Sequence, residues 1–117
     1  MLFRSHTHPE FGVLMAKYAE RSGASMMLLR GTEGEAVADA RRLPRLEVWL
    51  RGQRQESLCS AAQDGPLNTL PALPTAIDAA TVAGYIQQVL AGASALPAPI
   101  QQQADRLMQA HDTLRAA

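Results

Sequence analysis

The chain has 117 residues, enough for one modest hydrophobic core and therefore for a single domain. Eleven basic residues balance eleven acidic ones, so no overall charge points to nucleic acid, a membrane surface or an acidic partner, and any basic surface must be local. The single cysteine, Cys59, excludes an internal disulfide framework and fits a reducing compartment, which makes the cytoplasm the expected location; no apolar run is long enough for a membrane span.

The first predicted element is an amphipathic helix over residues 9–22. Pro9 suits the first helical position, Glu10 complements the positive end of the helix, and Gly23 is a typical stop. A strand over residues 26–29 follows, since four consecutive apolar residues are typical of a strand buried on both faces. A helix followed by such a strand favours an α/β fold with a parallel sheet, in which this strand is central.

Residues 30–45 are predicted to be a long loop, and a second strand follows the loop. Apolar and other residues alternate over residues 46–51, which indicates a strand with one solvent-facing side on which Trp49 lies. Residues 57–61 are a candidate short partner strand.

Two helices are predicted in the last third of the chain, and we expect them to form a C-terminal helix pair. Asp78 is the expected N-cap of the first helix, Ile77 and Val82 have the spacing of a hydrophobic staple, and Gly92 ends the helix. The predicted buried stripe of this helix comprises Val82, Tyr85, Ile86, Val89 and Leu90. The last helix starts at Pro97 and Pro99, and its predicted apolar face comprises Ile100, Ala104, Leu107, Met108, His111 and Leu114.

The stretch over residues 30–42 places two glycines and three carboxylates just after the predicted buried strand, where open α/β sheets bind ligands. Glycines let the backbone approach a phosphate closely, and carboxylates can hold magnesium. The candidate ligand or phosphate loop therefore comprises Arg30, Gly31, Thr32, Glu33, Gly34 and Glu35. A charged, solvated loop with two turn glycines explains the same residues equally well.

The order of these features resembles the C-terminal half of the anthranilate phosphoribosyltransferases, members of glycosyltransferase family 3. The matching segments are 9–23, 26–29, Arg30-Gly31-Thr32-Glu33-Gly34, 78–92 and 97–108, so the resemblance covers nearly the whole chain. It implies that residues 1–117 form a single partial α/β domain, the C-terminal part of a phosphoribosyltransferase-like domain, either as a fragment or as a truncated reading frame. Arg30 in place of the family's histidine is closer to a paralogue group implicated in nucleic-acid binding than to the tryptophan-pathway enzyme.

The chain also departs from that family. Ala36 and Val37 stand where the enzymes have an Asp-Glu pair for magnesium, and neither residue can ligate a hard cation. The family's Gly-Thr-Gly-Gly-Asp loop for phosphoribosyl pyrophosphate does not occur in the sequence. We therefore expect a portion that is noncatalytic by itself, with no catalytic residue, no metal site and no cofactor. The alternative is part of an active phosphoribosyltransferase whose pyrophosphate-binding half lies on other sequence, and only that alternative needs magnesium.

Five arginines lie within fourteen residues and are the candidate nucleic-acid contacts: Arg41, Arg42, Arg45, Arg51 and Arg54. A solvated loop and a charged edge strand, with Arg51 on the strand, explain the same cluster. A third hypothesis is a protein-interaction module. The expected partners are accordingly nucleic acid, the remainder of the family fold, or a second copy bound through exposed sheet surface, and no membrane.

Overall fold

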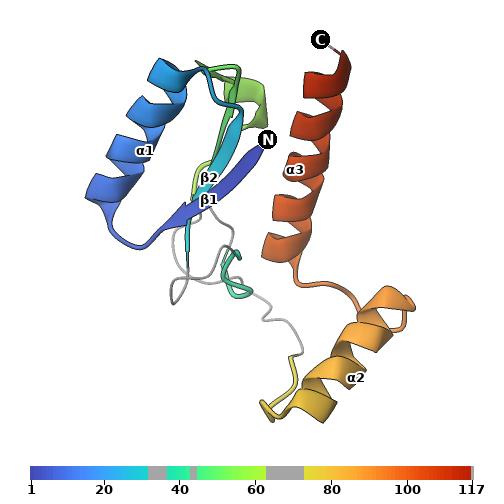
Figure 1. The fold of residues 1–117 in the computed structure, drawn as a ribbon. Coiled ribbons are helices and arrows are strands. Elements are labelled where there is room, and N and C mark those ends of the chain that lie inside the picture. The colour runs from blue at the N-terminus through green and yellow to red at the C-terminus, as the bar shows by residue number, and fades with distance from the viewer. Residues whose placement is uncertain (32–36, 43–44, 63–72, 117) are drawn as a thin grey trace.

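Four strands form one mixed sheet in the order β1-β2-β3-β4 (Figure 1). In this computed structural model, which describes residues 1–31, 37–42, 45–62 and 73–116, β1 (Leu2–His6) pairs with β2 (Met26–Arg30) in parallel. The third strand, β3 (Leu46–Leu50), pairs antiparallel with β2 and with the short β4 (Gln53–Arg54). The chain is thus of the α/β class, but the prediction of a parallel sheet is wrong beyond β1 and β2. An antiparallel neighbour needs only a reversal of the chain, and the segment between β2 and β3 has no helical period from which to build a crossover helix.

Helix α1 (Pro9–Ser22) connects β1 to β2, and its predicted bounds are confirmed. Gly23 ends the helix with φ 72°, in the left-handed region that favours glycine. Strand β1 was not predicted, because it is short and polar at its carboxyl end. The signal for it was indirect: a helix that precedes a buried parallel strand needs a strand before it.

The sheet is covered on both faces, as expected for the four consecutive buried residues of β2. Helix α1 lies on one face, where Ala19 packs with Met26, Leu28 and Trp49. Helix α3 (Ala98–Ala116) lies on the other face (Figure 1), where its Ala110 packs in a cluster with three strand residues, Met27, Val48 and Leu50. The chain therefore builds three layers, helix, sheet and helix.

The expected solvent-facing side of β3 is wrong at Trp49, which is 1% exposed. Trp49 shares a face with Met26, its partner in the β-ladder, and α1 covers that face. The predicted strand over residues 57–61 is also wrong, since this region holds a 3₁₀ turn (Glu56–Leu58) and a single bridge from Ser60 to Leu46.

Helix α2 (Ala79–Leu90) has the predicted cap, since the Asp78 carboxylate accepts from the Thr81 backbone N–H at 2.9 Å. All twelve residues of α2 are described and none of them is buried, so the predicted buried stripe is wrong. Ile77 is 95% exposed and makes no staple with Val82. Helix α2 stands away from the rest of the structure (Figure 1), so the expected helix pair does not pack as one.

The buried side of α3 is Pro99, Gln103 and Ala110, with Leu107 and Leu114 half-buried. The predicted apolar face is therefore right at Leu107 and Leu114 but wrong at Ala104, Met108 and His111, which are exposed. Within the described ranges, no helix combines the length and apolar character that crossing a membrane requires.

Candidate functional site

A cleft of about 1090 Å³ opens at the carboxyl ends of the parallel strands β1 and β2, on the side of the sheet that α1 covers. His6 ends β1 at this edge and Arg30 ends β2, and the Gly31 backbone N–H donates to the His6 carbonyl at 2.8 Å. Helix α1 forms one wall, from Pro9 to Glu20, and Asp39, Arg42, Arg45 and Glu47 form another. The cleft thus lies where the sequence predicted a ligand site, at the carboxyl edge of the buried strand.

Cationic side chains reach the cleft from three segments of the chain. Arg30 comes from β2, Arg42 and Arg45 come from the segment that leads into β3, and Lys17 comes from α1. The side chains of Arg42 and Arg45 are 53% and 63% exposed, so they remain open to solvent. We call Arg30, Arg42 and Arg45 the arginine rim.

Asp39 neutralises part of this charge. Its carboxylate lies 3.2 Å from Nε of Arg41 and 3.8 Å from Nε of Arg42, and it also accepts from the Arg41 backbone N–H at 2.9 Å. The backbone bond, followed by the side-chain bond from Arg41, holds the pKa of Asp39 below its usual value. Asp39 is therefore a counter-ion for two arginines in the free chain.

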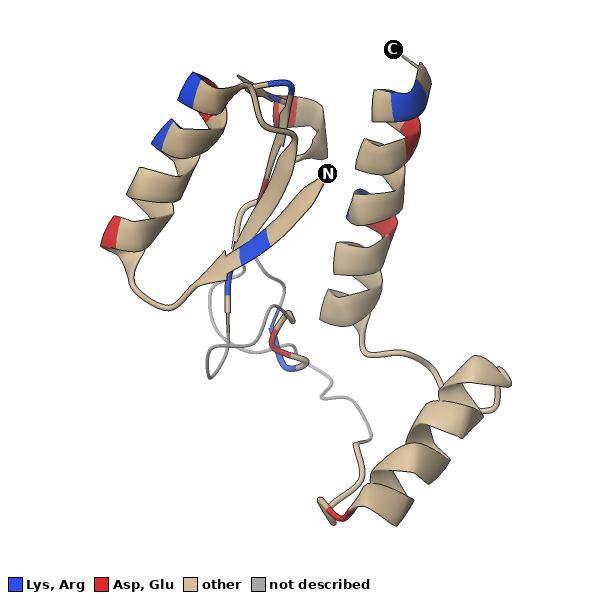
Figure 2. Cartoon of the chain, in the orientation of Figure 1, with Lys and Arg blue, Asp and Glu red and all other residues tan. Residues whose placement is uncertain are grey.

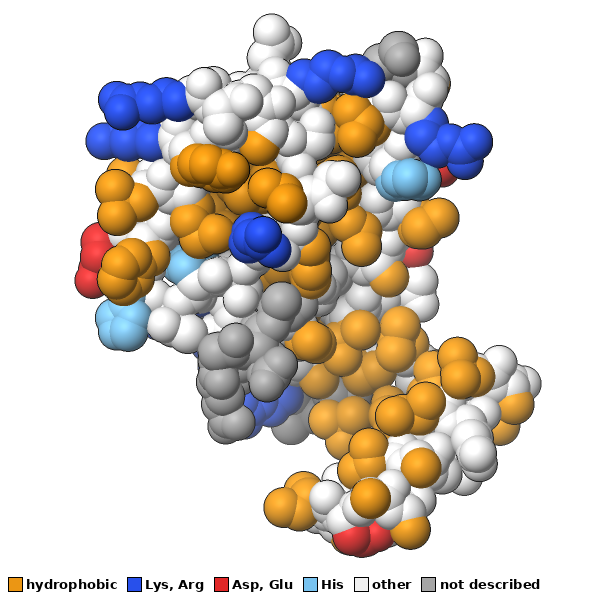
Figure 3. Space-filling view, in the orientation of Figure 1, with side chains coloured by type: hydrophobic (Ala, Val, Ile, Leu, Met, Phe, Trp, Pro, Cys, Tyr) orange, Lys and Arg blue, Asp and Glu red, His pale blue; other side chains and the backbone are white. Residues whose placement is uncertain are grey.

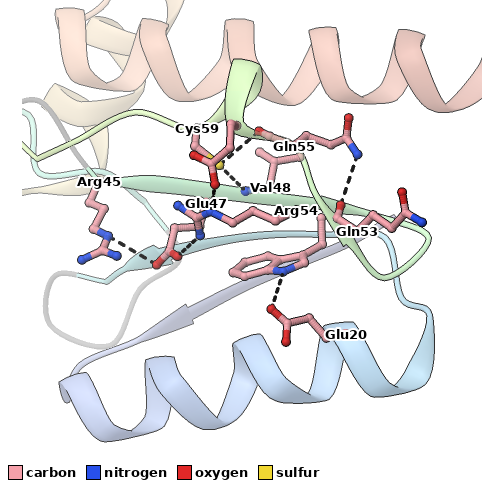
Figure 4. Close-up of polar contacts among 10 residues, drawn as sticks. Glu20, Arg45, Glu47, Val48, Gln53, Arg54, Gln55 and Cys59 are labelled. Atoms are coloured by element: carbon pink, nitrogen blue, oxygen red, sulfur yellow. Dashed lines mark hydrogen bonds and ion pairs between the residues drawn. The ribbon is translucent and has the colours of Figure 1, made fainter.

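Glu47 performs the same role for Arg45 and Arg54 (Figure 4). Its carboxylate lies 3.4 Å from Nε of Arg45 and accepts a hydrogen bond from Nη1 of Arg54. Arg54 also bonds Glu56 and stacks over the indole of Trp49, with the guanidinium carbon 5.6 Å from the ring centroid. The bond to Glu47 is the main cause of the raised pKa of Arg54, so this guanidinium is fixed to the sheet rather than free for a ligand.

A hydrogen bond joins the segment Val37–Arg42 to α3. The Ala38 backbone N–H donates to Oε1 of the buried Gln103 at 2.8 Å, and the Ala38 side chain packs between Leu29 and Leu46. Asp39, Arg41 and Arg42 follow directly, so their starting point is fixed by the core.

The structure brings together only part of the predicted ligand loop. Arg30 and Gly31 line the cleft, whereas Thr32, Glu33, Gly34 and Glu35 lie outside the described residues. Of the two positions that match the family's Asp-Glu pair, Ala36 is also outside the described residues and Val37 is 47% exposed.

The predicted arginine cluster is divided between two ends of the sheet. Three of them lie toward the carboxyl edge of β2: Arg41, Arg42 and Arg45. Arg51 lies at the other end of β3, about 20 Å from Arg45, because a strand rises about 3.3 Å per residue. Arg51 is not on a strand as expected. It has φ 50° and forms the β3–β4 turn with Gly52, and its side chain donates to the Leu114 carbonyl at 3.5 Å.

Sequence reasoning missed three residues that shape the site: Lys17, Glu47 and Gln103. Asp39 was one of the three carboxylates counted over residues 30–42, but as a candidate for holding magnesium and not as a counter-ion of arginines. Lys17 and Glu47 carried no local signal, because each reaches the cleft only through the packing of α1 against the sheet. Gln103 carried no sequence signal either, since it lies off the predicted apolar face of its helix and only the structure shows that it is buried with Pro99 and Ala110. Among the described residues, no three His, Cys, Asp or Glu side chains gather as a metal site requires.

Comparison with known proteins shows a similarity to part of a longer protein. No protein-family model matches the chain. YbiB of Escherichia coli strain K12, described as an uncharacterized protein, is 35% identical over 94 residues, which is 80% of this chain. The chain spans 28% of the length of YbiB, so the similarity concerns a portion of that protein.

Proposed function

We propose that the chain is the C-terminal portion of an anthranilate phosphoribosyltransferase-like protein, noncatalytic by itself, and that it binds nucleic acid non-specifically at the arginine rim in the cytoplasm. The observation that carries the proposal is the convergence of Arg30, Arg42 and Arg45, together with Lys17, on one open cleft. Guanidinium groups engage phosphate oxygens in pairs, and the neutralised phosphates release counterions.

The ion pairs of the free chain set the expected strength of binding. Asp39 and Glu47 each hold cleft arginines, so a phosphate must compete with a carboxylate for Arg42 and Arg45. Exposed pairs of this kind contribute only about 0–1 kcal/mol each, which a phosphate contact can replace. Because phosphates carry no base identity, we expect affinity to vary little with sequence.

Fluorescence anisotropy tests the proposal, with labelled random-sequence duplex and single strand titrated at several salt concentrations. The slope of log affinity against log salt is negative. Replacing Arg42 and Arg45 together by alanine should reduce its magnitude by about two units on duplex, since each phosphate contact contributes roughly 0.9. The matched control replaces Arg21 and Arg115, exposed arginines in the last turns of α1 and α3. Equal slopes for the cleft variant and the wild type would leave the rim as a solvated surface.

A second candidate is part of an active phosphoribosyltransferase whose pyrophosphate-binding half lies on other sequence. The position of the cleft at the carboxyl ends of two parallel strands favours it. Against it, Asp39 is engaged by Arg41 and Arg42, and the side chain of Val37 has no ligand atom. Calorimetry with magnesium and phosphoribosyl pyrophosphate separates the two. We expect no binding by this chain, and a dissociation constant of about 1 mM or tighter would favour the enzyme.

A further inference from the structure

We propose that Gln103 of α3 is a positioning residue for Arg42: it holds the segment Val37–Arg42 so that Arg42 reaches the cleft. This inference rests on nucleic-acid binding at the arginine rim and concerns how the rim is built. Gln103 does not line the cleft and acts through Ala38.

The contact joins two segments that are 65 residues apart in the sequence. The Ala38 N–H donates to Oε1 of Gln103 at 2.8 Å, and both groups are buried, with Gln103 8% and Ala38 4% exposed. A buried backbone N–H without an acceptor is strongly unfavourable, so removing this oxygen favours release of the segment into water. Loss of the Gln103 side chain would therefore release the backbone at Ala38, the residue before Asp39.

The consequence for the cleft passes through Asp39, the next residue. Asp39 binds the Arg41 backbone and side chain and lies within ion-pair distance of Arg42. When Ala38 is fixed by α3, this local turn presents Arg42 to the cleft. When Ala38 is released, Asp39 and its arginines move together and the rim loses Arg42.

Arg45 gives an internal comparison. It is held by Glu47 of β3, which the sheet fixes independently of Gln103. A positioning role therefore predicts a selective effect: loss of Gln103 removes the contribution of Arg42 and leaves that of Arg45.

The test uses salt-dependent anisotropy on duplex with Gln103→Met, which keeps the length of the side chain but removes the acceptor. We expect the magnitude of the salt slope of this variant to be smaller than that of the wild type by about one unit, as for Arg42→Ala. Adding Arg42→Ala to Gln103→Met should change the slope no further. Adding Arg45→Ala to Gln103→Met should reduce the magnitude of the slope by about one more unit. Gln101→Met is the control, since Gln101 is exposed on the same helix and bonds Asp105.

Hydrogen exchange at the Ala38 amide separates this inference from the proposed function. Protection in the wild type that is lost in Gln103→Met, but not in Gln101→Met, supports the positioning contact even if no nucleic acid binds, in which case only the function fails. A wild-type Ala38 amide that exchanges like an unstructured one overturns the inference, and this measurement needs no variant that folds. The inference is also overturned if Gln103→Met has the wild-type slope. It is overturned as well if Arg42→Ala and Arg45→Ala change the slope of the Gln103→Met protein by the same amount.

Discussion

Single side chains decide how much charge the cleft has available. Asp39 and Glu47 each bind two arginines, so these two carboxylates hold the cations in place. The sequence suggested magnesium binding for the carboxylates of residues 30–42, Asp39 among them, and no role for Glu47. Arg54 is committed to Trp49, Glu47 and Glu56, and Arg51 to the Leu114 carbonyl. Proximity in the sequence therefore overstated the number of arginines that one ligand could reach.

Asp39 gives the residue-scale prediction on pH. Its pKa is lower in the folded chain than in the unfolded one, chiefly through the Arg41 backbone bond. A lowered folded pKa contributes stability above the unfolded value of about 3.9, and this contribution is lost as pH falls through the folded value. Asp39→Asn should therefore lower the free energy of unfolding by less than about 1 kcal/mol at pH 6, since the pair is partly exposed.

Urea unfolding of both proteins between pH 6 and pH 2 measures this difference. It should shrink toward zero at the acid end, where the wild-type carboxyl is protonated too. A difference that stays constant over the whole range would show that the ionised carboxylate is not the stabilising group.

Trp49 gives the second prediction at this scale. It is 1% exposed between α1 and the sheet, and its indole N–H donates to Glu20 at 3.4 Å. Trp49→Ala should lower the free energy of unfolding by about 3–5 kcal/mol, because it leaves a cavity in the core. Phe11→Ala is the matched control, since Phe11 is 53% exposed on the outer face of α1. A comparable loss from both variants in denaturant unfolding would contradict the burial of Trp49.

At the scale of elements, α2 differs from the two other α-helices. It carries no charged residue (Figure 2), and none of its residues is buried. Isolated helices of this length are only marginally stable in water, so α2 depends on local interactions for its stability. The Asp78 cap is the strongest of these, and the bond from the Thr81 N–H lowers the pKa of Asp78.

We therefore expect Asp78→Ala to reduce the helical fraction of residues 79–90 while leaving the main unfolding transition unchanged. Backbone carbon chemical shifts report the helical fraction, and a thermal melt followed through Trp49 fluorescence reports the sheet. Asp112→Ala, an exposed change near the carboxyl end of α3, is the control for charge removal. A lower melting temperature for Asp78→Ala alone would indicate that α2 packs on the sheet.

At the scale of the whole molecule, apolar side chains remain at the surface of the α-helices (Figure 3). Helix α1 exposes Phe11, Leu14 and Tyr18, which line a shallow groove of about 610 Å³ together with the end of the edge strand β1. On α2, Ile86 and Leu90 are exposed. Apolar surface and an unpaired strand edge both favour association.

The corresponding prediction is that the chain self-associates. Sedimentation at several concentrations should show species larger than the monomer, and Leu14→Lys together with Leu90→Lys should weaken association about tenfold or more, since each buried apolar side chain contributes about 1.5–3 kcal/mol. Lys17→Arg, a change that keeps the charge, is the control. A wild-type monomer with one cooperative unfolding transition would count against this prediction and against the interaction-module hypothesis.

The sequence by itself determined the local elements. The bounds of α1, the burial of β2, the stop at Gly23 and the cap at Asp78 were all predictable, because each depends on residues within a few positions of one another. Glycines and charges directly follow the buried strand in the sequence, and the structure has a cleft at that edge of the sheet. Ligand binding there stays a prediction.

Only the tertiary structure decided which surfaces are covered and which charges meet. Trp49 is buried because α1 lies over that face of the sheet, and the stripe on α2 is exposed because no described element packs against it. The antiparallel course of β3 places Arg45 at the cleft and Arg51 at the far end of the strand. Gln103 meets Ala38 only because α3 returns to the sheet. Burial and charge pairing depend on which distant segment arrives at a surface, and the period of a single segment does not contain that information.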